Sequence, residues 1–249
     1  MDHVDLHFHL LPGVDDGPAD LPDSLDLARA ALGEGTGAVV ATPHVRIDLG
    51  PTDAREIQAR VHDLRAALSA ANVPLEVGCG AELGHEMAFR LRQDELELLA
   101  QGPPGARWLL VEAPFHGIGE DFHAATAELR TRGFGVLVAH PERSADAALD
   151  AAAGLRRELA AGSLAQLNAL SLTGGHGEEA CASAWALIAD GLVAVVASDA
   201  HGPSRPPALR LAHDALLGGG LAPATASALV KTGPRALLSR GMRPSAAAA

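Results

Sequence analysis

Short apolar runs alternate along this chain with longer amphipathic segments. Each run is mostly continuous in hydrophobicity and is bounded by glycine, proline or polar residues, which is typical of strands buried on both faces of a parallel sheet. The expected strands are residues 4–9, 38–43, 75–81, 108–113, 135–140, 164–168 and 192–197.

The alanine-rich segments between these runs have the helical spacing of apolar side chains. The expected helices are residues 21–33, 53–71, 121–132, 145–161 and 178–190. Glycines, which favour helix ends, close or follow several of them: Gly33, Gly133, Gly162 and Gly191. Seven strand-then-helix units predict one barrel-like α/β domain, with an open doubly wound sheet as the alternative.

Length, composition and charge argue against a membrane protein and against nucleic acid as a partner. The chain has 249 residues, and no apolar run approaches the roughly 18 residues that a membrane helix needs. The N-terminus shows no secretory signal, so we expect a cytoplasmic location without membrane insertion. A net charge of −12 disfavours nucleic acid and anionic lipid as partners. The alanine-rich end, residues 244–249, is expected to fray.

Ionisable side chains gather where the predicted strands end. In parallel barrels the active site lies at the carboxyl ends of the strands, and six of the seven predicted strands end in such a group. The sixth strand is the exception and ends in Asn168. The groups are, in chain order, His7, His9, His44, Glu82, Glu112, His140, Asp199 and His201.

The spacing within this set adds geometry. His7 and His9 lie two apart on one strand, so their side chains point to the same side, and Asp199 and His201 repeat the spacing. A lone strand-end histidine is more often a hydrogen-bonded structural group, but a buried cluster of imidazoles and carboxylates is costly unless it is paired. Such donors suit zinc, manganese or iron, so we interpret the set as a divalent metal site.

The other histidines and the cysteines receive simpler interpretations. Seven histidines lie mostly on predicted helices or loops and are expected to be solvated: His3, His62, His85, His116, His123, His176 and His213. Of these, His116 and His123 could approach the site from a loop. Cys79 and Cys181 indicate no disulfide framework, and neither has an arginine six residues on, as a cysteine-dependent tyrosine phosphatase needs.

The motifs around the candidate ligands follow one another in a specific order. They are Asp5-Leu-His-Phe-His-Leu-Leu-Pro-Gly-Val-Asp-Asp-Gly17, Ala41-Thr-Pro-His44, Gly80-Ala-Glu82, Leu110-Val-Glu-Ala-Pro114, Ala139-His-Pro-Glu-Arg143, Asn168-Ala-Leu-Ser-Leu-Thr-Gly174 and Ala197-Ser-Asp-Ala-His201. Together they resemble the polymerase and histidinol phosphatase (PHP) superfamily and, within it, the bacterial protein-tyrosine phosphatases linked to capsule and exopolysaccharide synthesis.

This resemblance implies a single-domain, distorted seven-stranded TIM-like (β/α) barrel over residues 1–243. It also implies two or three divalent metal ions, manganese first and iron or zinc as alternatives. The implied ligands are, for the first ion, His7, His9, Glu82 and Asp199; for the second, Glu82, Glu112 and His140; and for the third, Asp16, His44 and His201. Arg143 and Arg205 match positions that would grip the phosphate, and Asp15 is expected to be a turn residue.

The implied activity is hydrolysis of protein phosphotyrosine, with the tyrosine-rich tail of a bacterial tyrosine kinase as partner. The resemblance is also compatible with an oligomer of this chain. The hypothesis for the mechanism is in-line attack on phosphorus by a metal-bridging hydroxide, with Arg143 and Arg205 on the equatorial oxygens. The chain departs from this branch at Val45, where a second histidine is common, and at Ser144, where an aromatic is common. Because tyrosine is absent, Phe115 or Phe122 would have to supply an aromatic wall.

Three alternatives remain open. A small-molecule phosphatase, for example one acting on histidinol phosphate, would share every metal ligand. An amidohydrolase also uses His-x-His on a barrel strand, but the mid-barrel lysine that many of them use has no counterpart, since the only lysine is Lys231. A non-catalytic, metal-stabilised regulatory barrel would also keep the ligand set.

Overall fold

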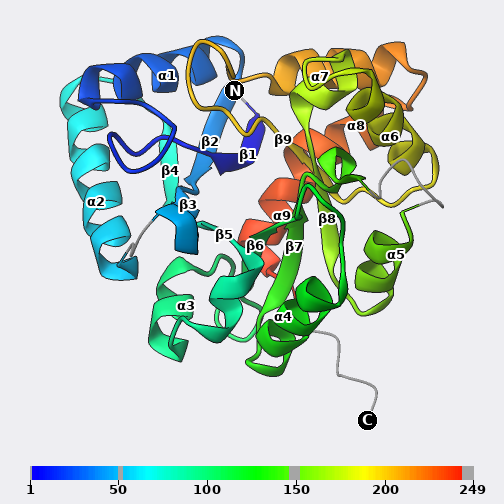
Figure 1. Cartoon of the computed structure of the whole chain (residues 1–249). Helices are drawn as coiled ribbons and strands as arrows, with labels where there is room; N and C mark the ends of the chain where they lie inside the picture. Colours follow the sequence, from blue (N-terminus) through cyan, green and yellow to red (C-terminus); the bar gives the residue numbers. More distant parts are fainter. Residues whose placement is uncertain (1, 50–52, 146–151, 243–249) are drawn as a thin grey trace.

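The computed structural model describes residues 2–49, 53–145 and 152–242. Short parallel strands form the wall of the fold, and helices lie outside it (Figure 1). The strands are β1 (His3–Phe8), β2 (Thr36–Ala41), β3 (His44–Val45), β4 (Glu76–Cys79), β5 (Glu82–Leu83), β6 (Trp108–Glu112), β7 (Gly135–Ala139), β8 (Leu164–Asn168) and β9 (Val195–Ala197). The helices are α1 (Leu21–Gly33), α2 (Ala54–Ala70), α3 (Gln93–Leu99), α4 (Glu120–Thr131), α5 (Ala153–Ala160), α6 (Glu178–Ala189), α7 (Leu209–Gly218), α8 (Pro223–Ser227) and α9 (Gly233–Arg240).

Two parallel sheets make up the wall within the described residues. One has the strand order β1-β2-β4, and the other has the order β3-β5-β6-β7-β8-β9. Because β3 closely follows β2 and β5 closely follows β4, each pair is one strand interrupted near its carboxyl end. β3 and β5 pair in the register His44↔Glu82, which places two predicted ligands side by side.

The segment after β9 connects the end of this wall to its beginning. The backbone N–H of Asp199 donates to the His7 carbonyl at 2.9 Å, and the N–H of His9 donates to the Ala200 carbonyl at 2.9 Å. Phe8 and Ala200 form an isolated parallel bridge. Within the described residues the wall is therefore a distorted seven-stranded barrel, as predicted, and the open doubly wound sheet is wrong.

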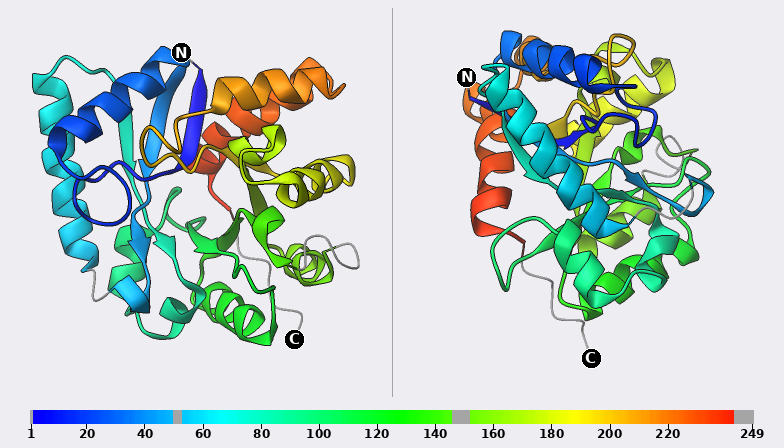
Figure 2. Two further views of the ribbon diagram at one scale, coloured as in Figure 1. Left: turned by 45° about the horizontal axis from the view of Figure 1, so that its top comes forward. Right: turned by 90° about the vertical axis from the view of Figure 1, so that its left-hand side faces the viewer.

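Apolar side chains fill both sides of the wall. Leu6, Trp108 and Leu137 belong to a cluster that draws side chains from strands around the ring, so this cluster fills the barrel interior. A larger cluster lies between the strands and the helices, where Leu27 of α1 and Ile57 of α2 are buried. Helices α1 and α2 cover one side of the wall, and α6 and α7 cover the opposite side (Figure 2). With both faces covered, the ends of the strands are where polar side chains can reach solvent.

The predicted elements are confirmed with shifts at their ends. The predicted strand 38–43 is interrupted at Pro43, which has no backbone donor. The predicted strand 75–81 ends at Cys79, and the predicted strand 192–197 starts only at Val195 because the Leu192 N–H still donates to the Leu187 carbonyl of α6. The apolar pattern did not predict helices α3, α7, α8 and α9.

Some expectations fall on undescribed residues. The predicted helix 145–161 is seen as α5 from residue 153, and residues 146–151 lie outside the described part. The predicted tail, 244–249, also lies outside it. Across the described ranges, no helix is long and apolar enough to cross a membrane.

Candidate functional site

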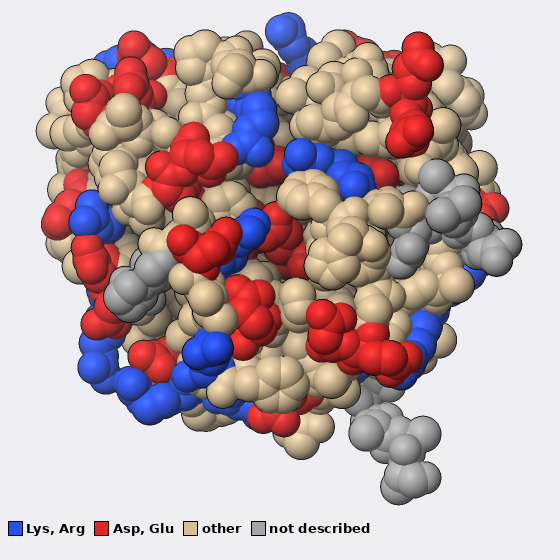
Figure 3. All heavy atoms as spheres, viewed as in Figure 1, with Lys and Arg blue, Asp and Glu red and all other residues tan. Residues whose placement is uncertain are grey.

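The carboxyl ends of the strands meet on one face of the barrel, and the nine predicted metal ligands lie there. His7, His44, Glu82 and Glu112 lie on strands, and the others lie in segments that join strands to helices. Most of the nine are buried, whereas His44 is partly exposed and Asp16 is exposed. Basic and acidic side chains surround a hollow near the centre of the face in view in Figure 3. The fold thus brings together residues that are far apart in the sequence.

Five of the six separations among four donor atoms are close to those of a tetrahedron, and all four atoms lie within 4.8 Å of one another. The Nε2 atoms of His7 and His9 are 3.1 Å apart. Glu82 Oε2 lies 3.1 and 3.4 Å from these two nitrogens. Asp199 Oδ1 lies 3.3 and 3.4 Å from them. A tetrahedral cation with ligand bonds of about 2.0–2.1 Å separates its ligands by about 3.3–3.4 Å. The four atoms therefore fit around one divalent cation.

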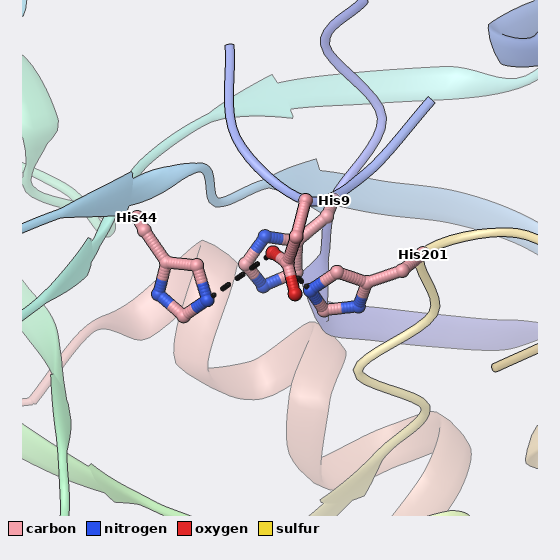
Figure 4. A group of neighbouring side chains, drawn as sticks. His9, His44 and His201 are labelled. Atoms are coloured by element: carbon pink, nitrogen blue, oxygen red, sulfur yellow. Dashed lines mark ion pairs between the residues drawn. The ribbon is translucent and has the colours of Figure 1, made fainter. Parts of the chain in front are cut away.

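A second group adjoins the first through His9. The donor atoms of His9, Asp16, His44 and His201 lie within 4.8 Å of one another. Asp16 Oδ1 lies 3.1 Å from His201 Nε2 and 3.5 Å from His44 Nε2. Figure 4 shows the three imidazole rings converging from separate segments of the chain. Three of these residues are the ones that the family resemblance assigns to a third ion.

A third group shares Glu82 with the first. It consists of His44, Glu82 and Glu112. His140 also approaches Glu82, with its Nε2 atom 2.8 Å from Oε1. The resemblance pairs Glu82 and Glu112 with His140, whereas in this structure His44 reaches the two carboxylates. The Glu82 carboxylate is therefore the link between neighbouring groups.

Several polar atoms of these groups are buried without a hydrogen-bond partner among the described residues. They include Nδ1 of His44, Oε2 of Glu82 and Nδ1 of His140. His44 Nδ1 and Glu82 Oε2 are 2.9 Å apart but are not aligned for a hydrogen bond. Buried polar atoms are nearly always satisfied in folded proteins. A shared cation would satisfy both lone pairs, so the donor set fits divalent metal.

Two of the candidate ligands have a strained backbone. His140 has φ 36° and Asp199 has φ 53°, in the left-handed region that non-glycine residues avoid. Such a residue costs about 1–2 kcal/mol. The two residues directly follow or closely follow β7 and β9, where the chain turns away from the wall. Strain of this kind is concentrated at functional sites, where it fixes the direction of a side chain.

Burial and charge act against one another in the site. Burial alone would raise the pKa of Glu82 and Asp199, but the charge of His7 and hydrogen bonds from histidines hold the pKa of both well below the usual range. Burial lowers the pKa of His7, but Glu82 and Asp199 outweigh it and raise that pKa to about 9. Burial, reinforced by the charge of Glu82, raises the pKa of Glu112. Without a cation, the cluster therefore retains protons.

The two predicted arginines border the candidate metal groups. Arg143 donates from Nη1 to Asp199 Oδ2 at 3.4 Å. Arg205 donates from Nη2 to Asp16 Oδ2 at 2.7 Å, and its Nη1 lies 3.8 Å from Asp199 Oδ2. Both guanidinium groups thus sit beside carboxylates of the site.

Arg46 is a third arginine at the site, and it was not predicted. Its Nη1 donates to Glu112 Oε2 at 2.8 Å, and its Nε and Nη2 each donate to Asp48 at 3.0 Å. Because Arg46 lies two residues after His44, the same-side spacing that linked His7 and His9 also pointed to it.

Asp15 was expected to be a turn residue, and that interpretation is incomplete. Its Oδ1 accepts the Gly17 N–H at 3.0 Å, as in a turn. Its Oδ2 lies 2.7 Å from His9 Nδ1 and accepts the His44 N–H at 3.0 Å. On the other side of the site, Gln166 Oε1 lies 3.0 Å from His7 Nδ1. Asp15 and Gln166 therefore contact the Nδ1 atoms of His9 and His7 and fix the orientation of the two rings, so that each Nε2 atom faces the site.

The prediction that the remaining histidines are solvated is wrong for His3 and His123, which are buried. His123 lies on α4 with Nδ1 2.6 Å from Glu158 Oε1, and Glu158 also accepts from Arg130 at 2.9 Å. His123 is therefore part of a structural network and not of the site. His116 is exposed and lines a hollow next to Glu112.

The two candidate aromatic walls differ in placement. Phe122 is fully buried, so it cannot contact a substrate. Phe115 is 49% exposed. Its ring is nearly parallel to that of His140, with centroids 6.0 Å apart, and the Arg143 guanidinium lies 4.9 Å from its centroid. Phe115 thus places an aromatic surface beside the hollow.

Comparison with known proteins links this geometry to a family. The family model for capsular polysaccharide synthesis, CpsB/CapC, matches residues 3–237. The tyrosine-protein phosphatase YwqE of Bacillus subtilis (strain 168) is 28% identical over 198 residues, which cover 80% of this chain and 77% of YwqE.

Solved structures agree with the sequence match. A chain from the crystal structures of YwqE from Bacillus subtilis and CpsB from Streptococcus pneumoniae, described as unique metal-dependent tyrosine phosphatases, superposes with a TM-score of 0.81. Sequence identity is 25%, and the match covers 96% of each chain. A phosphotriesterase homology protein from Escherichia coli superposes with a TM-score of 0.61 at 14% identity, over 94% of this chain and 97% of that one. This second likeness shows the barrel fold alone.

Proposed function

Because this chain belongs to the CpsB/CapC family of capsular polysaccharide synthesis, we propose that it is a metal-dependent phosphatase acting on phosphotyrosine in a protein. A relative and a matching structure are described as tyrosine phosphatases, and the latter as metal-dependent. The site supports the same chemistry, since donors suited to divalent cations lie beside arginines that suit phosphate.

The observation that carries the proposal is the near-tetrahedral set of His7, His9, Glu82 and Asp199 atoms. A structural cluster would satisfy its members by hydrogen bonds to one another. Here Glu82 Oε2 lies within 3.4 Å of both imidazoles and yet has no hydrogen-bond partner among the described residues. A cation accounts for both facts.

We assign two or three divalent ions to the site, with manganese first and iron or zinc as alternatives. Clustered cations of this kind supply positive charge and make water a nucleophile near neutral pH. The proposed ligands are His7, His9, Asp16, His44, Glu82, Glu112, His140, Asp199 and His201.

The chain's own residues would bind and orient the phosphate. Arg143 and Arg205 lie beside Asp199 and Asp16, and their planar forks suit two oxygens of one phosphate. Arg143 also rests over Phe115, which limits the directions that its guanidinium can take. The phenol leaving group, with a pKa of about 10, needs less protonation than an alkoxide. The site therefore suits an aryl phosphate without a dedicated general acid.

The exposed ring of Phe115 offers an apolar, aromatic surface to the phenyl ring of a phosphotyrosine. By analogy with the relatives' names, the substrate would be a phosphorylated protein. The tyrosine-rich tail of a bacterial tyrosine kinase, which the family resemblance implies, is the proposed partner. The cytoplasmic location stays a prediction from the sequence.

The test is a panel of phosphoesters with metal-stripped protein. Hydrolysis of a phosphotyrosyl peptide should return on addition of Mn²⁺, and histidinol phosphate and a phosphoseryl peptide should be hydrolysed more slowly. His140→Ala should abolish metal-dependent hydrolysis of an aryl phosphate, whereas His62→Ala, at an exposed position on α2, should not. Metal bound without turnover of any phosphoester would instead favour a regulatory barrel.

A further inference from the structure

A groove with a volume of about 700 Å³ opens directly beside the candidate site. Its walls are the segment after β1, one face of α1 and the segment after β9, and the last of these passes close to α1 in Figure 1. Asp16, His201 and Arg205 line the groove and also belong to the site. A phosphate held by Arg205 would therefore lie at the inner end of the groove.

The groove is larger than the reacting group requires. Cavities of about 300–1,000 Å³ hold ligands of drug size, whereas a phenyl phosphate needs only the mouth beside Phe115 and Arg143. A phosphotyrosine in a protein is also attached to polypeptide, which must leave the site along the surface. The groove offers that path because it is continuous with the site through Asp16 and Arg205.

The lining of the groove is apolar at its base and acidic at its rim. Pro18 and Leu27 are buried, and Pro206 contributes a rigid apolar surface from the opposite wall. Asp23 and Asp26 are exposed on α1 at the rim. Asp26 pairs with Arg29 at 2.7 Å. Because Arg29 balances the charge of Asp26, the net negative charge on the α1 side of the rim comes from Asp23.

We propose that this groove binds the polypeptide segment next to the phosphotyrosine. An apolar side chain of that segment would pack between Pro18 and Pro206, and a lysine or arginine would lie beside Asp23 and Asp26. The inference rests on the proposed function, because it assigns the groove to the same substrate. It adds that sequence around the phosphotyrosine, and not the phosphate alone, determines which substrate is preferred.

Peptides and a small aryl phosphate separate the groove from the catalytic chemistry. We expect a peptide with apolar and lysine neighbours to be hydrolysed with a kcat/KM about three- to tenfold above that of a peptide with glutamate neighbours. Asp23→Asn/Asp26→Asn should remove most of this preference. Ala30→Trp, which fills the groove from the exposed side of α1, should raise KM for every peptide. Neither variant should change hydrolysis of p-nitrophenyl phosphate by more than about twofold.

The matched control is Glu56→Gln/Asp63→Asn on α2. It also removes two exposed carboxylates, of which Glu56 is paired with Arg60 and lies in the first turn of its helix. This control should keep the peptide preference. A preference that is equal in the Asp23→Asn/Asp26→Asn variant and the control would overturn the proposal.

Failure of the groove and failure of the proposed function give different results. If p-nitrophenyl phosphate is not hydrolysed at all, the proposed function fails. The groove can then still be tested by measuring the binding of non-hydrolysable phosphonate peptides with fluorescence anisotropy. Equal affinity for lysine- and glutamate-flanked peptides in the wild-type protein would refute the groove, and tighter binding of the lysine-flanked peptide that is lost in the Asp23→Asn/Asp26→Asn variant would support it.

Discussion

The Nδ1 atom of His9 lies 2.7 Å from the Oδ2 atom of Asp15, whereas the Nε2 atom of the same ring faces the other candidate ligands. A carboxylate in this position fixes the ring orientation and the tautomer, and it makes the other nitrogen a better ligand. His9 takes part in two of the candidate groups, so its orientation affects both. Asp15 is therefore a positioning residue and not a ligand in this arrangement.

Replacing Asp15 by asparagine should weaken metal binding without unfolding the protein. Asparagine can still accept the Gly17 N–H, but it lacks the charge that stabilises the His9 N–H. We expect the dissociation constant for Mn²⁺ to rise about 10- to 100-fold, as for other residues behind metal ligands. Calorimetric titration measures this, with Asp63→Asn on α2 as the control. An unchanged dissociation constant would mean that Asp15 only stabilises the turn at Gly17 and does not influence metal binding.

Replacing Arg205 by lysine should reduce catalysis and leave metal content unchanged. Lysine keeps the charge, but it cannot form the paired hydrogen bonds of a guanidinium to two phosphate oxygens. Loss of one charged hydrogen bond of about 1.5–3 kcal/mol lowers kcat/KM for an aryl phosphate about 10- to 150-fold. Arg210→Lys, at an exposed position on α7, serves as the control. If Arg205→Lys retained full activity, Arg205 would not contact the phosphate.

Replacing Glu158 by glutamine should lower stability in a pH-dependent way. Burial alone would raise the pKa of Glu158, but His123 and Arg130 hold it below the usual value. A lowered folded-state pKa stabilises the fold above the unfolded pKa of about 4.3, and this contribution is lost as the pH falls through the folded value. At pH 7 we expect the variant to lose about 3–5 kcal/mol of unfolding free energy.

The same comparison at low pH tests the cause. The difference between the wild-type protein and Glu158→Gln should shrink below about pH 4, because the wild-type carboxyl group is then protonated as well. Urea unfolding at several pH values measures this difference. A difference that stays constant from pH 7 to pH 3 would show that charge has no part in it.

The strained backbone at His140 predicts an unusual order of stabilities. With φ at 36°, glycine should be better tolerated there than alanine. In metal-free protein we expect His140→Gly to be more stable than His140→Ala by about 1 kcal/mol. Ala66→Gly, at an exposed position within α2, should show the opposite sign, a loss of about 1 kcal/mol. Thermal unfolding with chelator present measures both, and a more stable His140→Ala would mean that the backbone relaxes.

The apolar pattern predicted the wall of the barrel because each strand is covered on both faces and so carries an almost unbroken apolar run. The pattern predicted the ends of the strands less well, because backbone hydrogen bonding determines where a strand begins and ends. Pro43 interrupts the second strand, and the capping of α6 at Leu192 delays the last strand. Short helices such as α3 carry too few apolar positions for a clear period, so they were missed.

The sequence by itself determined which residues stand at the strand ends, and hence the candidate ligands and the family. Spacing along a strand fixes only which side of that strand a side chain faces. Tertiary structure decided the rest, because donors such as His7 and Asp199 are 192 positions apart and their 3.3 Å separation depends on how the barrel closes. It also decided the partners that no local pattern encodes: Asp15 behind His9, Arg46 on Glu112, and the burial of His123 against Glu158.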